Sequence, residues 1–209
     1  ADIEEGAALR TAGVTAQILV FGALSVSDLD GLFDCALTPT ISTPGAARAV
    51  AAAADKYGQP IRYHLKIDTG MNRLGVSVDE AAALAPRIRT ENHGITLLIS
   101  HLACAEQPDH PLNQRQIELF REVRLLYRGI PGSLANSSGI FLGNSAHCDM
   151  VRPGAALFGV NPTPGHRNPM QRVIELRARV VQVRSVPKGE TIGYNATWTA
   201  KHAARMAIL

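Results

Sequence analysis

Two basic side chains, Lys66 and Arg73, lie on either side of a polar turn that follows an apolar run. Residues 61–67 have the pattern of a buried strand, and Asp68-Thr69-Gly70 comes directly after it. Parallel α/β sheets and barrels hold their ligands at the carboxyl ends of their strands. We therefore expect Arg73 to lie where such a sheet binds a ligand.

A histidine, His101, ends a second apolar run at residues 97–100. At the end of a strand a single histidine can be either structural or catalytic, and by itself it is more often structural. Cys104 follows at H-x-x-C spacing, but no second pair of ligands accompanies it. The sequence therefore predicts no metal site.

Two loops rich in small residues offer backbone amides to a phosphate. Asn136-Ser137-Ser138-Gly139 follows a short strand-like stretch, and Arg152-Pro153-Gly154-Ala155 precedes another. Small residues allow close approach of N–H groups to an anion, and the Ser137 hydroxyl adds a further donor. Loops after late strands often grip phosphate in (β/α)₈ barrels. A later segment, Gly193-Tyr194-Asn195-Ala196-Thr197, is weak evidence alone, because a tyrosine in a strand is usually core or interface.

The elements that must position these residues alternate between strand and helix. Apolar runs and turn residues predict strands at residues 17–22, 35–42, 61–67, 95–101, 132–135 and 150–160. Helical patterns lie between them at residues 28–33, 44–57, 78–89 and 111–127, after a first helix at 1–12, and Thr43 and Pro44 suit the start of one of them. This alternation predicts an α/β fold with a parallel sheet, either doubly wound or part of a (β/α)₈ barrel.

The pattern changes after Val160. Residues 161–169 are rich in proline and glycine and read as a linker. An alternating run at 173–186, the turn Pro187-Lys188-Gly189 and a strand-like stretch at 191–198 then follow without helices. Such alternation predicts the start of an antiparallel β-domain.

Composition places the chain in the ordinary globular class. Its 209 residues are 46% hydrophobic, enough for a sizeable core, and the formal net charge of +3 suits an anionic ligand. The basic residues are scattered, which disfavours nucleic acid as a partner. Three cysteines without a CxxC pair favour reduced thiols, and no apolar run approaches a bilayer span. We therefore expect a cytoplasmic protein with no membrane partner.

Taken in order, these segments resemble those of the alanine racemases, bacterial fold-type III enzymes that use pyridoxal 5'-phosphate (PLP). Residues 66–73, Lys-Ile-Asp-Thr-Gly-Met-Asn-Arg, keep every residue that defines the family segment. The remaining motifs come in the family's order and at nearly its intervals: His101-Leu-Ala, Asn136-Ser137, Arg152-x-Gly154 and Gly193-Tyr194-x-Ala-Thr197. Coincidence of five separate motifs is much less probable than coincidence of one.

The resemblance implies a PLP-binding (β/α)₈ barrel, incomplete here, over residues 1–165, and the beginning of a C-terminal β-domain over 166–209. It implies an isomerase that interconverts L-alanine and D-alanine through a PLP aldimine by two-base proton transfer. Such an enzyme provides D-alanine for peptidoglycan or breaks it down. The family's members are homodimers whose active sites use residues of both subunits.

The resemblance also assigns catalytic roles at matching positions. Tyr194 matches the base that removes the α-proton of L-alanine across the dimer interface. Arg152 would face the pyridine nitrogen and His101 would orient Arg152. Because a guanidinium stays protonated, the ring nitrogen should remain neutral, which disfavours side reactions such as transamination. Asn195 stands where the family has glycine, and asparagine tolerates left-handed backbone conformations.

Further positions would bind the cofactor. Arg73 matches the arginine that bonds the phenolic oxygen, and Lys66 matches a lysine that is carbamylated in many members. A carbamate would replace repulsion of Arg73 by a charge-assisted hydrogen bond. The phosphate-side residues implied by the resemblance are Asn136, Ser137 and the amides of Gly154 and Ala155.

One family motif is absent. The lysine that forms the internal aldimine lies in an N-terminal Lys-x-Asn-Ala-Tyr-Gly motif, and none of the lysines present has that context: Lys56, Lys66, Lys188 and Lys201. The chain also begins in a helical pattern without methionine and ends in an apolar run. We therefore expect an internal fragment that is inactive alone, without the first barrel strands, the aldimine lysine and part of the β-domain.

Three alternatives stay open. A single-domain PLP carrier with a similar barrel would lack the β-domain suggested by residues 171–209. A related racemase could act on serine or another amino acid, because specificity lies partly in segments outside this sequence. A non-catalytic barrel remnant could be retained for an interaction.

Overall fold

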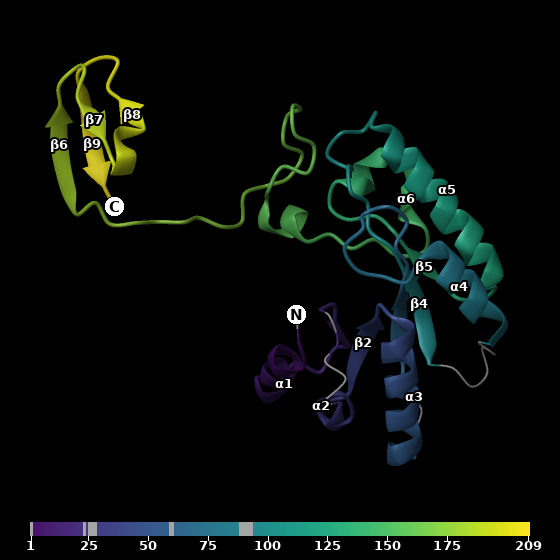
Figure 1. The fold of residues 1–209 in the computed structure, drawn as a ribbon. Coiled ribbons are helices and arrows are strands. Elements are labelled where there is room, and N and C mark those ends of the chain that lie inside the picture. Colours follow the sequence, from purple (N-terminus) through teal and green to yellow (C-terminus); the bar gives the residue numbers. More distant parts are fainter. Residues whose placement is uncertain (1, 23, 25–28, 59–60, 88–93) are drawn as a thin grey trace. The chain divides into compact units, whose positions relative to one another are not determined.

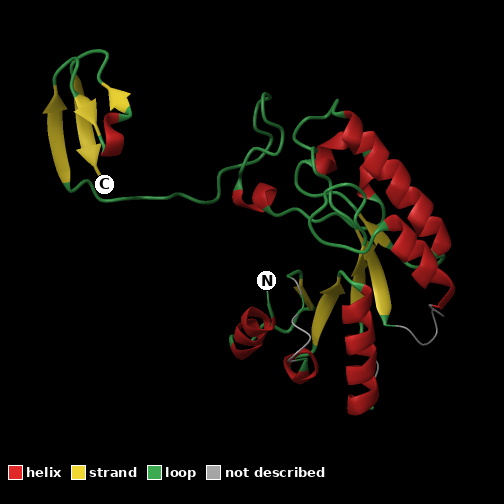
Figure 2. Cartoon of the chain, in the orientation of Figure 1, coloured by secondary structure: helices red, strands yellow, loops and turns green. Residues whose placement is uncertain are grey.

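The computed structural model describes residues 2–22, 24, 29–58, 61–87 and 94–209. It divides into two compact units, Ala1–Gln171 and Arg172–Leu209. The first unit is built on a parallel sheet with helices, and the second is made of short antiparallel strands (Figures 1 and 2). The α/β class predicted from the sequence is confirmed.

The sheet of the first unit has five parallel strands in the order β1-β2-β3-β4-β5. Their bounds are β1 Ile18–Val20, β2 Leu37–Ile41, β3 Tyr63–Lys66, β4 Ile95–Ile99 and β5 Gly132–Ser133. Each strand pairs with its successor in the chain, whereas a doubly wound sheet reverses its strand order part-way. This order is that of a partial (β/α)₈ barrel.

Helices occupy the connections between strands. The α-helices are α1 Ile3–Thr11, α2 Asp30–Asp34, α3 Pro44–Tyr57, α4 Val78–Leu84, α5 Pro111–Leu126 and α6 Asn144–His147; the short 3₁₀ turns are η1 Ala85–Arg87, η2 Gly139–Leu142 and η3 Ala155–Phe158. Local signals explain where several begin. The Thr43 hydroxyl accepts a hydrogen bond from the Ala46 amide ahead of Pro44, as predicted, and Ser77 with Glu80 forms a capping box at α4.

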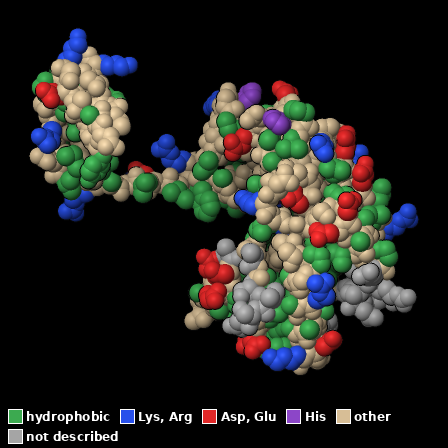
Figure 3. Space-filling model, viewed as in Figure 1, with side chains coloured by type: hydrophobic (Ala, Val, Ile, Leu, Met, Phe, Trp, Pro, Cys, Tyr) green, Lys and Arg blue, Asp and Glu red, His purple; other side chains and the backbone are tan. Residues whose placement is uncertain are grey.

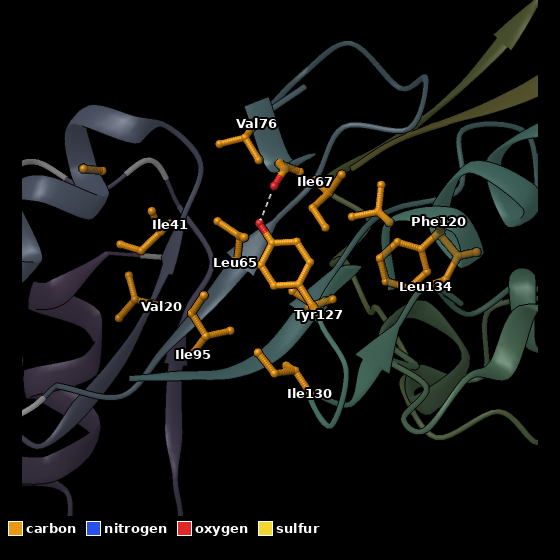
Figure 4. Packing of buried hydrophobic residues seen from close by; sticks show 14 of the residues in the cluster. Val20, Ile41, Leu65, Ile67, Val76, Ile95, Phe120, Tyr127, Ile130 and Leu134 are labelled. Atoms are coloured by element: carbon orange, nitrogen blue, oxygen red, sulfur yellow. Dashed lines mark hydrogen bonds between the residues drawn. The ribbon is translucent and has the colours of Figure 1, made fainter. Parts of the chain in front are cut away.

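One face of the sheet packs against the helices. Leu65 of β3 is buried there with Phe120 of α5 (Figure 4), and Leu98 of the neighbouring strand β4 belongs to the same buried cluster. Tyr127 lies among these side chains, and its hydroxyl donates to the Ala81 carbonyl at 2.7 Å, which ties α5 to α4. Burial raises the pKa of Tyr127 to about 12, so the phenol stays protonated.

The opposite face carries polar side chains. Successive residues of a strand point to opposite faces, so His64 and Lys66 point away from the helix-packed core that contains Leu65. The register places Thr40 beside His64, and Lys66 beside Ile99. The side chains of Thr40, His64 and Lys66 therefore share the face of the sheet opposite this core.

Several predicted strands are shorter than expected, and two predictions differ most from the structure. Residues 150–160 form no strand: after the Arg152 amide bonds the Ala135 carbonyl, the next amides turn toward the Ser137 side chain, and η3 follows. The run 173–186 forms a strand only at β6, Gln182–Val186. In both places an apolar or alternating pattern is present, but most of the expected ladder partners are missing.

The second unit pairs β6 with β9, Ala204–Ile208, in antiparallel fashion. The stretch predicted as one strand at 191–198 is divided into β7 Thr191–Ile192 and β8 Trp198–Thr199, which pair with each other around the 3₁₀ turn η4 Tyr194–Ala196. The antiparallel character predicted for this part is confirmed.

Charged side chains are mixed over the face of the first unit seen in Figure 3, where lysine and arginine are interspersed with acidic residues. Within the described ranges, no helix combines the length and apolar character needed to cross a bilayer.

Candidate active site

Lys66, the last residue of β3, is 7% exposed and lies among other cations. Burial lowers its pKa, the charges of Arg73 and Arg152 lower it further, and Asp68 opposes them. An ammonium in this position is disfavoured by both desolvation and repulsion. The site therefore favours a neutral amine or an anionic neighbour at Lys66.

The loop after β3 is folded by a single carboxylate. Asp68 Oδ1 accepts hydrogen bonds from the amides of Gly70, Met71 and Asn72 at 2.8, 3.0 and 3.1 Å. This Asx-type turn leads directly into Arg73, which is exposed. The position of Arg73 thus depends on the backbone that Asp68 holds.

Gly75 closes the same loop onto the strand. It has φ +133°, and a Cβ there would lie 2.7 Å from the Asp68 nitrogen. The Val76 amide then bonds the Lys66 carbonyl at 2.9 Å, and the Asp68 amide bonds the Val76 carbonyl at 2.8 Å. Only glycine allows this close return.

His101 follows β4 and is neutral. Burial lowers its pKa to about 4, and the charges of Arg152, Arg73 and Lys66 add to the effect. Asn136 Nδ2 lies 3.3 Å from His101 Nε2, while Asn136 Oδ1 accepts from the Gly139 amide at 2.9 Å. An amide nitrogen only donates, so His101 Nε2 is the unprotonated nitrogen.

Arg152 is held by its planar guanidinium at the ends of β4 and β5. Nη1 donates to Ser133 Oγ, and Nη2 donates to the carbonyls of Ser100 and Leu134. Burial lowers its pKa to about 10, so it remains protonated at neutral pH. No hydrogen bond joins His101 to Arg152 among the described residues, and Arg152 acts on His101 through its charge, which lowers the pKa of the imidazole.

The two small-residue loops meet at Ser137. Its Oγ accepts hydrogen bonds from the amides of Gly154 at 2.9 Å and Ala156 at 3.2 Å. The sequence pointed to the amides of Gly154 and Ala155, and the structure turns Ala156 rather than Ala155 toward Ser137. The loops of Asn136-Ser137 and Arg152-Gly154 therefore lie against each other.

Tyr194 belongs to the second unit, where its side chain is 97% exposed. Gly193 before it has φ +79°, and Asn195 after it has φ +58°. Asn195 thus takes a left-handed conformation, which asparagine was expected to tolerate in place of the family's glycine. This turn presents the phenol to solvent.

The sequence did not identify the buried residues that hydrogen-bond beneath the site loops, above all Gln116, Thr69 and Ser100. Each is buried, at 0%, 2% and 1% exposure, and they bond one another. A signal was present: Gln116 and Asn113 lie on the helix face that also carries Ile117 and Phe120. A polar side chain on an otherwise apolar face must find buried partners.

Metal ligands do not gather in the described residues, which contain no group of three or more His, Cys, Asp or Glu side chains able to hold an ion. The groups that do gather at the site are cations, a neutral imidazole and backbone amides.

Comparison with known proteins identifies the relatives of this arrangement. Residues 1–162 match the family model described as alanine racemase, N-terminal domain, and residues 173–209 match the alanine racemase C-terminal domain. The chain belongs to the alanine racemase family. The resemblance carried by its motifs is thereby confirmed.

Curated alanine racemases match along the whole chain. One from Methylobacterium sp. (strain 4-46) is 43% identical over 209 residues, covering 100% of this chain and 57% of that protein. One from Rhizobium meliloti is 41% identical, covering 99% of this chain and 55% of that protein. The chain therefore spans little more than half the length of the curated alanine racemases it matches.

Solved alanine racemases share the fold. The enzyme from Bartonella henselae, crystallised with covalently bound pyridoxal phosphate, has a TM-score of 0.83 and 28% identity, covering 99% of this chain and 58% of its own. The biosynthetic alanine racemase from Pseudomonas aeruginosa has a TM-score of 0.82 and 32% identity, again covering 99% and 58%. The partial barrel and the β-unit are therefore those of the alanine racemase fold.

Proposed function

We propose that the whole protein carrying this chain interconverts L-alanine and D-alanine with PLP as cofactor. Membership of the alanine racemase family supports the reaction, as do relatives named both biosynthetic and catabolic. The observation that carries the proposal is the gathering of Lys66, His101 and Arg152 at one site, where the charge of Arg152 adds to burial in lowering the pKa of both Lys66 and His101. When bound, PLP withdraws electron density from the α-carbon of an amino acid and makes its proton acidic.

The residues present fit that cofactor. Three basic side chains lie close together at the site: Lys66, Arg73 and Arg152. The carboxylate of Asp68 partly offsets their repulsion. PLP is anionic at its phosphate and its phenolic oxygen, so it would offset this repulsion. Asn136, Ser137 and the backbone amides of Gly154 and Ala155 would bind the phosphate, and the contact of the Gly154 amide with Ser137 Oγ keeps two of these groups together.

Arg152 would set the protonation of the pyridine nitrogen. Its guanidinium is already fixed by Ser133 and by backbone carbonyls, and it stays protonated at neutral pH. It can donate a hydrogen bond to the nitrogen but does not readily give up a proton. The ring would stay neutral, which favours simple removal and return of the α-proton.

Arg73 would bond the phenolic oxygen, and Lys66 would hold Arg73. The lowered pKa of Lys66 increases its fraction of free amine, which can add to carbon dioxide with loss of one proton. The product is a carbamate, which would pair with Arg73 instead of repelling it. His101 would stay neutral beside this group.

Tyr194 would remove the α-proton of L-alanine in a second subunit's site, which makes the active protein a homodimer. A phenol near pKa 10 is a poor base at neutral pH, so nearby cations must stabilise its phenolate. The exposed turn at Gly193 and Asn195 leaves this side chain free to enter such a site.

We also propose a cytoplasmic location, because the three cysteines are free and thiols persist in reducing compartments. The product would serve peptidoglycan synthesis or D-alanine breakdown. The barrel domain would extend to residue 165, and the β-domain would begin at 166.

The 209-residue chain alone would not racemise alanine, because none of its lysines stands in the family's cofactor-lysine motif. The test measures D-alanine formation and α-proton exchange with solvent in the whole protein and in this chain. Borohydride reduction with PLP and peptide mapping then locate any pyridoxyl-lysine. Activity in the whole protein with none in the chain supports the proposal; a specific adduct and activity in the chain alone, or no activity in the whole protein, refutes it.

A further inference from the structure

Gln116, in the middle of α5, binds two loops of the candidate site at once. Its Oε1 accepts a hydrogen bond from the Ala103 amide at 2.9 Å, and its Nε2 donates to the His101 carbonyl at 2.9 Å and to Thr69 Oγ1 at 3.1 Å. The side chain is fully buried. Both ends of its amide are therefore satisfied by groups that belong to the loops after β3 and β4.

The contacts continue from Thr69 toward Arg152. Thr69 Oγ1 and Ser100 Oγ lie 2.8 Å apart in the interior, and the Ser100 carbonyl accepts from the Arg152 guanidinium. Buried polar atoms that are fully paired resist displacement, because breaking one bond leaves its partner unsatisfied. The path from α5 to Arg152 thus has three consecutive links.

Thr69 also lies inside the turn that leads to Arg73. The carboxylate of its neighbour Asp68 holds the following three amides, so a shift of Thr69 moves the whole turn. His101 is likewise held from two sides: Gln116 bonds its carbonyl, and Asn136 contacts its ring. Gln116 is the one described side chain that bonds both the Thr69 loop and the His101 loop.

We propose that Gln116 is a positioning residue of the reaction, which sets the spacing of Arg73, His101 and Arg152 without touching substrate or cofactor. The proposal rests on the proposed function. A misplacement of about 1 Å can lower a rate by about a hundredfold when reacting groups must be aligned. One buried amide would therefore control both cofactor affinity and turnover.

An amide is required for this role. Glutamate has the same shape and could still accept from Ala103, but its carboxylate would face the His101 carbonyl with no proton to donate. Methionine fills a similar volume and makes none of the three bonds. We expect both Gln116→Glu and Gln116→Met to lower racemase activity at neutral pH. Gln116→Glu should recover part of that activity at lower pH, because its buried carboxyl then gains a proton.

The experiment uses the whole protein and five variants. Gln116→Met removes the amide, and Gln114→Met makes the same change two residues away, where the side chain is exposed and bonds Glu118. Tyr127→Phe removes a different buried hydrogen bond of this region and controls for lost stability. Thr69→Val removes the hydroxyl that the first two links share, whereas Thr69→Ser preserves it.

Hydrogen exchange, PLP titration and kinetics are read together. In Gln116→Met we expect faster exchange at Ala103 and at residues 70–72, a Kd for PLP raised about tenfold and kcat lowered about a hundredfold. Thr69→Val should act in the same direction, Thr69→Ser should restore most of the activity, and the Gln114 and Tyr127 variants should stay within about twofold of wild type.

Each outcome decides between interpretations. Unchanged exchange at the two loops overturns the inference whatever the activity. Faster exchange with unchanged PLP affinity and kcat in an active protein overturns it too, and shows a structural role only. If wild type neither binds PLP nor racemises alanine, the proposed function fails and the positioning role fails with it, while the exchange data still report whether the two loops are coupled.

Discussion

Asn136 Nδ2 lies 3.3 Å from His101 Nε2. Asn136 Oδ1 accepts a hydrogen bond from the Gly139 amide, and this contact fixes which end of the Asn136 side chain faces His101. The imidazole is therefore an acceptor at Nε2. Burial lowers the pKa of His101 and the charges of Arg152, Arg73 and Lys66 lower it further, so at neutral pH His101 is a neutral group that accepts a hydrogen bond.

Asn136→Asp should favour the protonated form of His101. A carboxylate oxygen in place of Nδ2 would stabilise a protonated His101, so the pKa of His101 should rise from about 4 toward its ordinary value. Racemase activity should then fall as pH drops below about 6.5, because each further pH unit below the pKa lowers the neutral fraction of His101 about tenfold. NMR titration of the His101 ring protons gives the pKa. Asn144→Asp, at the exposed start of α6, is the control and should leave that pKa unchanged; an unmoved pKa in Asn136→Asp would contradict the assignment.

His64 makes stability depend on pH. It is 4% exposed, its Nδ1 has no hydrogen-bond partner among the described residues, and burial together with Arg152 lowers its pKa to about 4. Because the unfolded chain takes up this proton at higher pH than the folded one, stability is full above about pH 6.5 and falls as pH drops toward 4. The loss amounts to at most roughly 3 kcal/mol.

His64→Gln should flatten that dependence. Urea unfolding of the whole protein between pH 7 and pH 4 measures the free energy of unfolding in wild type and variant. As pH falls from 7 to 4, the free energy of unfolding of wild type should decrease by more than that of the variant. Parallel curves across this window would show that His64 does not titrate with a lowered pKa.

Gly75→Ala should lower stability by more than backbone strain alone would. Its φ of +133° is unfavourable for alanine, and the new Cβ would meet the Asp68 nitrogen at 2.7 Å. Gly13→Ala is the matched control, since Gly13 also has positive φ, +86°, but open space around it. We expect about 1 kcal/mol of lost stability for Gly13→Ala and about 2 to 3 kcal/mol for Gly75→Ala.

The same substitution should affect function only at Gly75. Displacing Asp68 opens the turn before Arg73, so the Kd for PLP should rise in Gly75→Ala and stay constant in Gly13→Ala. Thermal unfolding and PLP titration measure the two effects. Equal losses of stability in both variants would mean that the loop adjusts around the added methyl group.

The sequence predicted local structure well where the signal was local. Thr43-Pro44 begins α3 as expected, because a side-chain cap and a fixed φ act within one turn. The strand expected at residues 150–160 is absent, because the amides of Gly154 and Ala156 bond a serine nearly twenty positions earlier in the chain. Such partners come from tertiary structure and leave no periodic pattern.

Motif spacing predicted which residues gather, but not what holds them. Lys66, His101 and Arg152 were identified from order and neighbouring residues. Gln116 was not, because its partners Thr69 and Ala103 lie on two different loops and only the fold brings them to one helix position. The supporting contacts of the site are therefore visible only in three dimensions.

Arg152→Lys should show how much the guanidinium's shape contributes. Lysine keeps the charge, but it cannot bond Ser133 Oγ and the carbonyls of Ser100 and Leu134 with a planar fork. The cation at this position would then be mobile and able to give up a proton. We expect kcat to fall about a hundredfold, as for other misaligned groups, with a smaller change in KM.

Ser133→Ala separates the two contributions of Arg152, because it removes one acceptor and leaves the guanidinium itself in place. Since the backbone carbonyls still hold Nη2, this variant should lose no more than about tenfold in kcat. Steady-state kinetics in both directions of racemisation measure these effects. If Ser133→Ala were as impaired as Arg152→Lys, the orientation of Arg152 would depend chiefly on Ser133; if neither variant were impaired, Arg152 would have no part in the reaction.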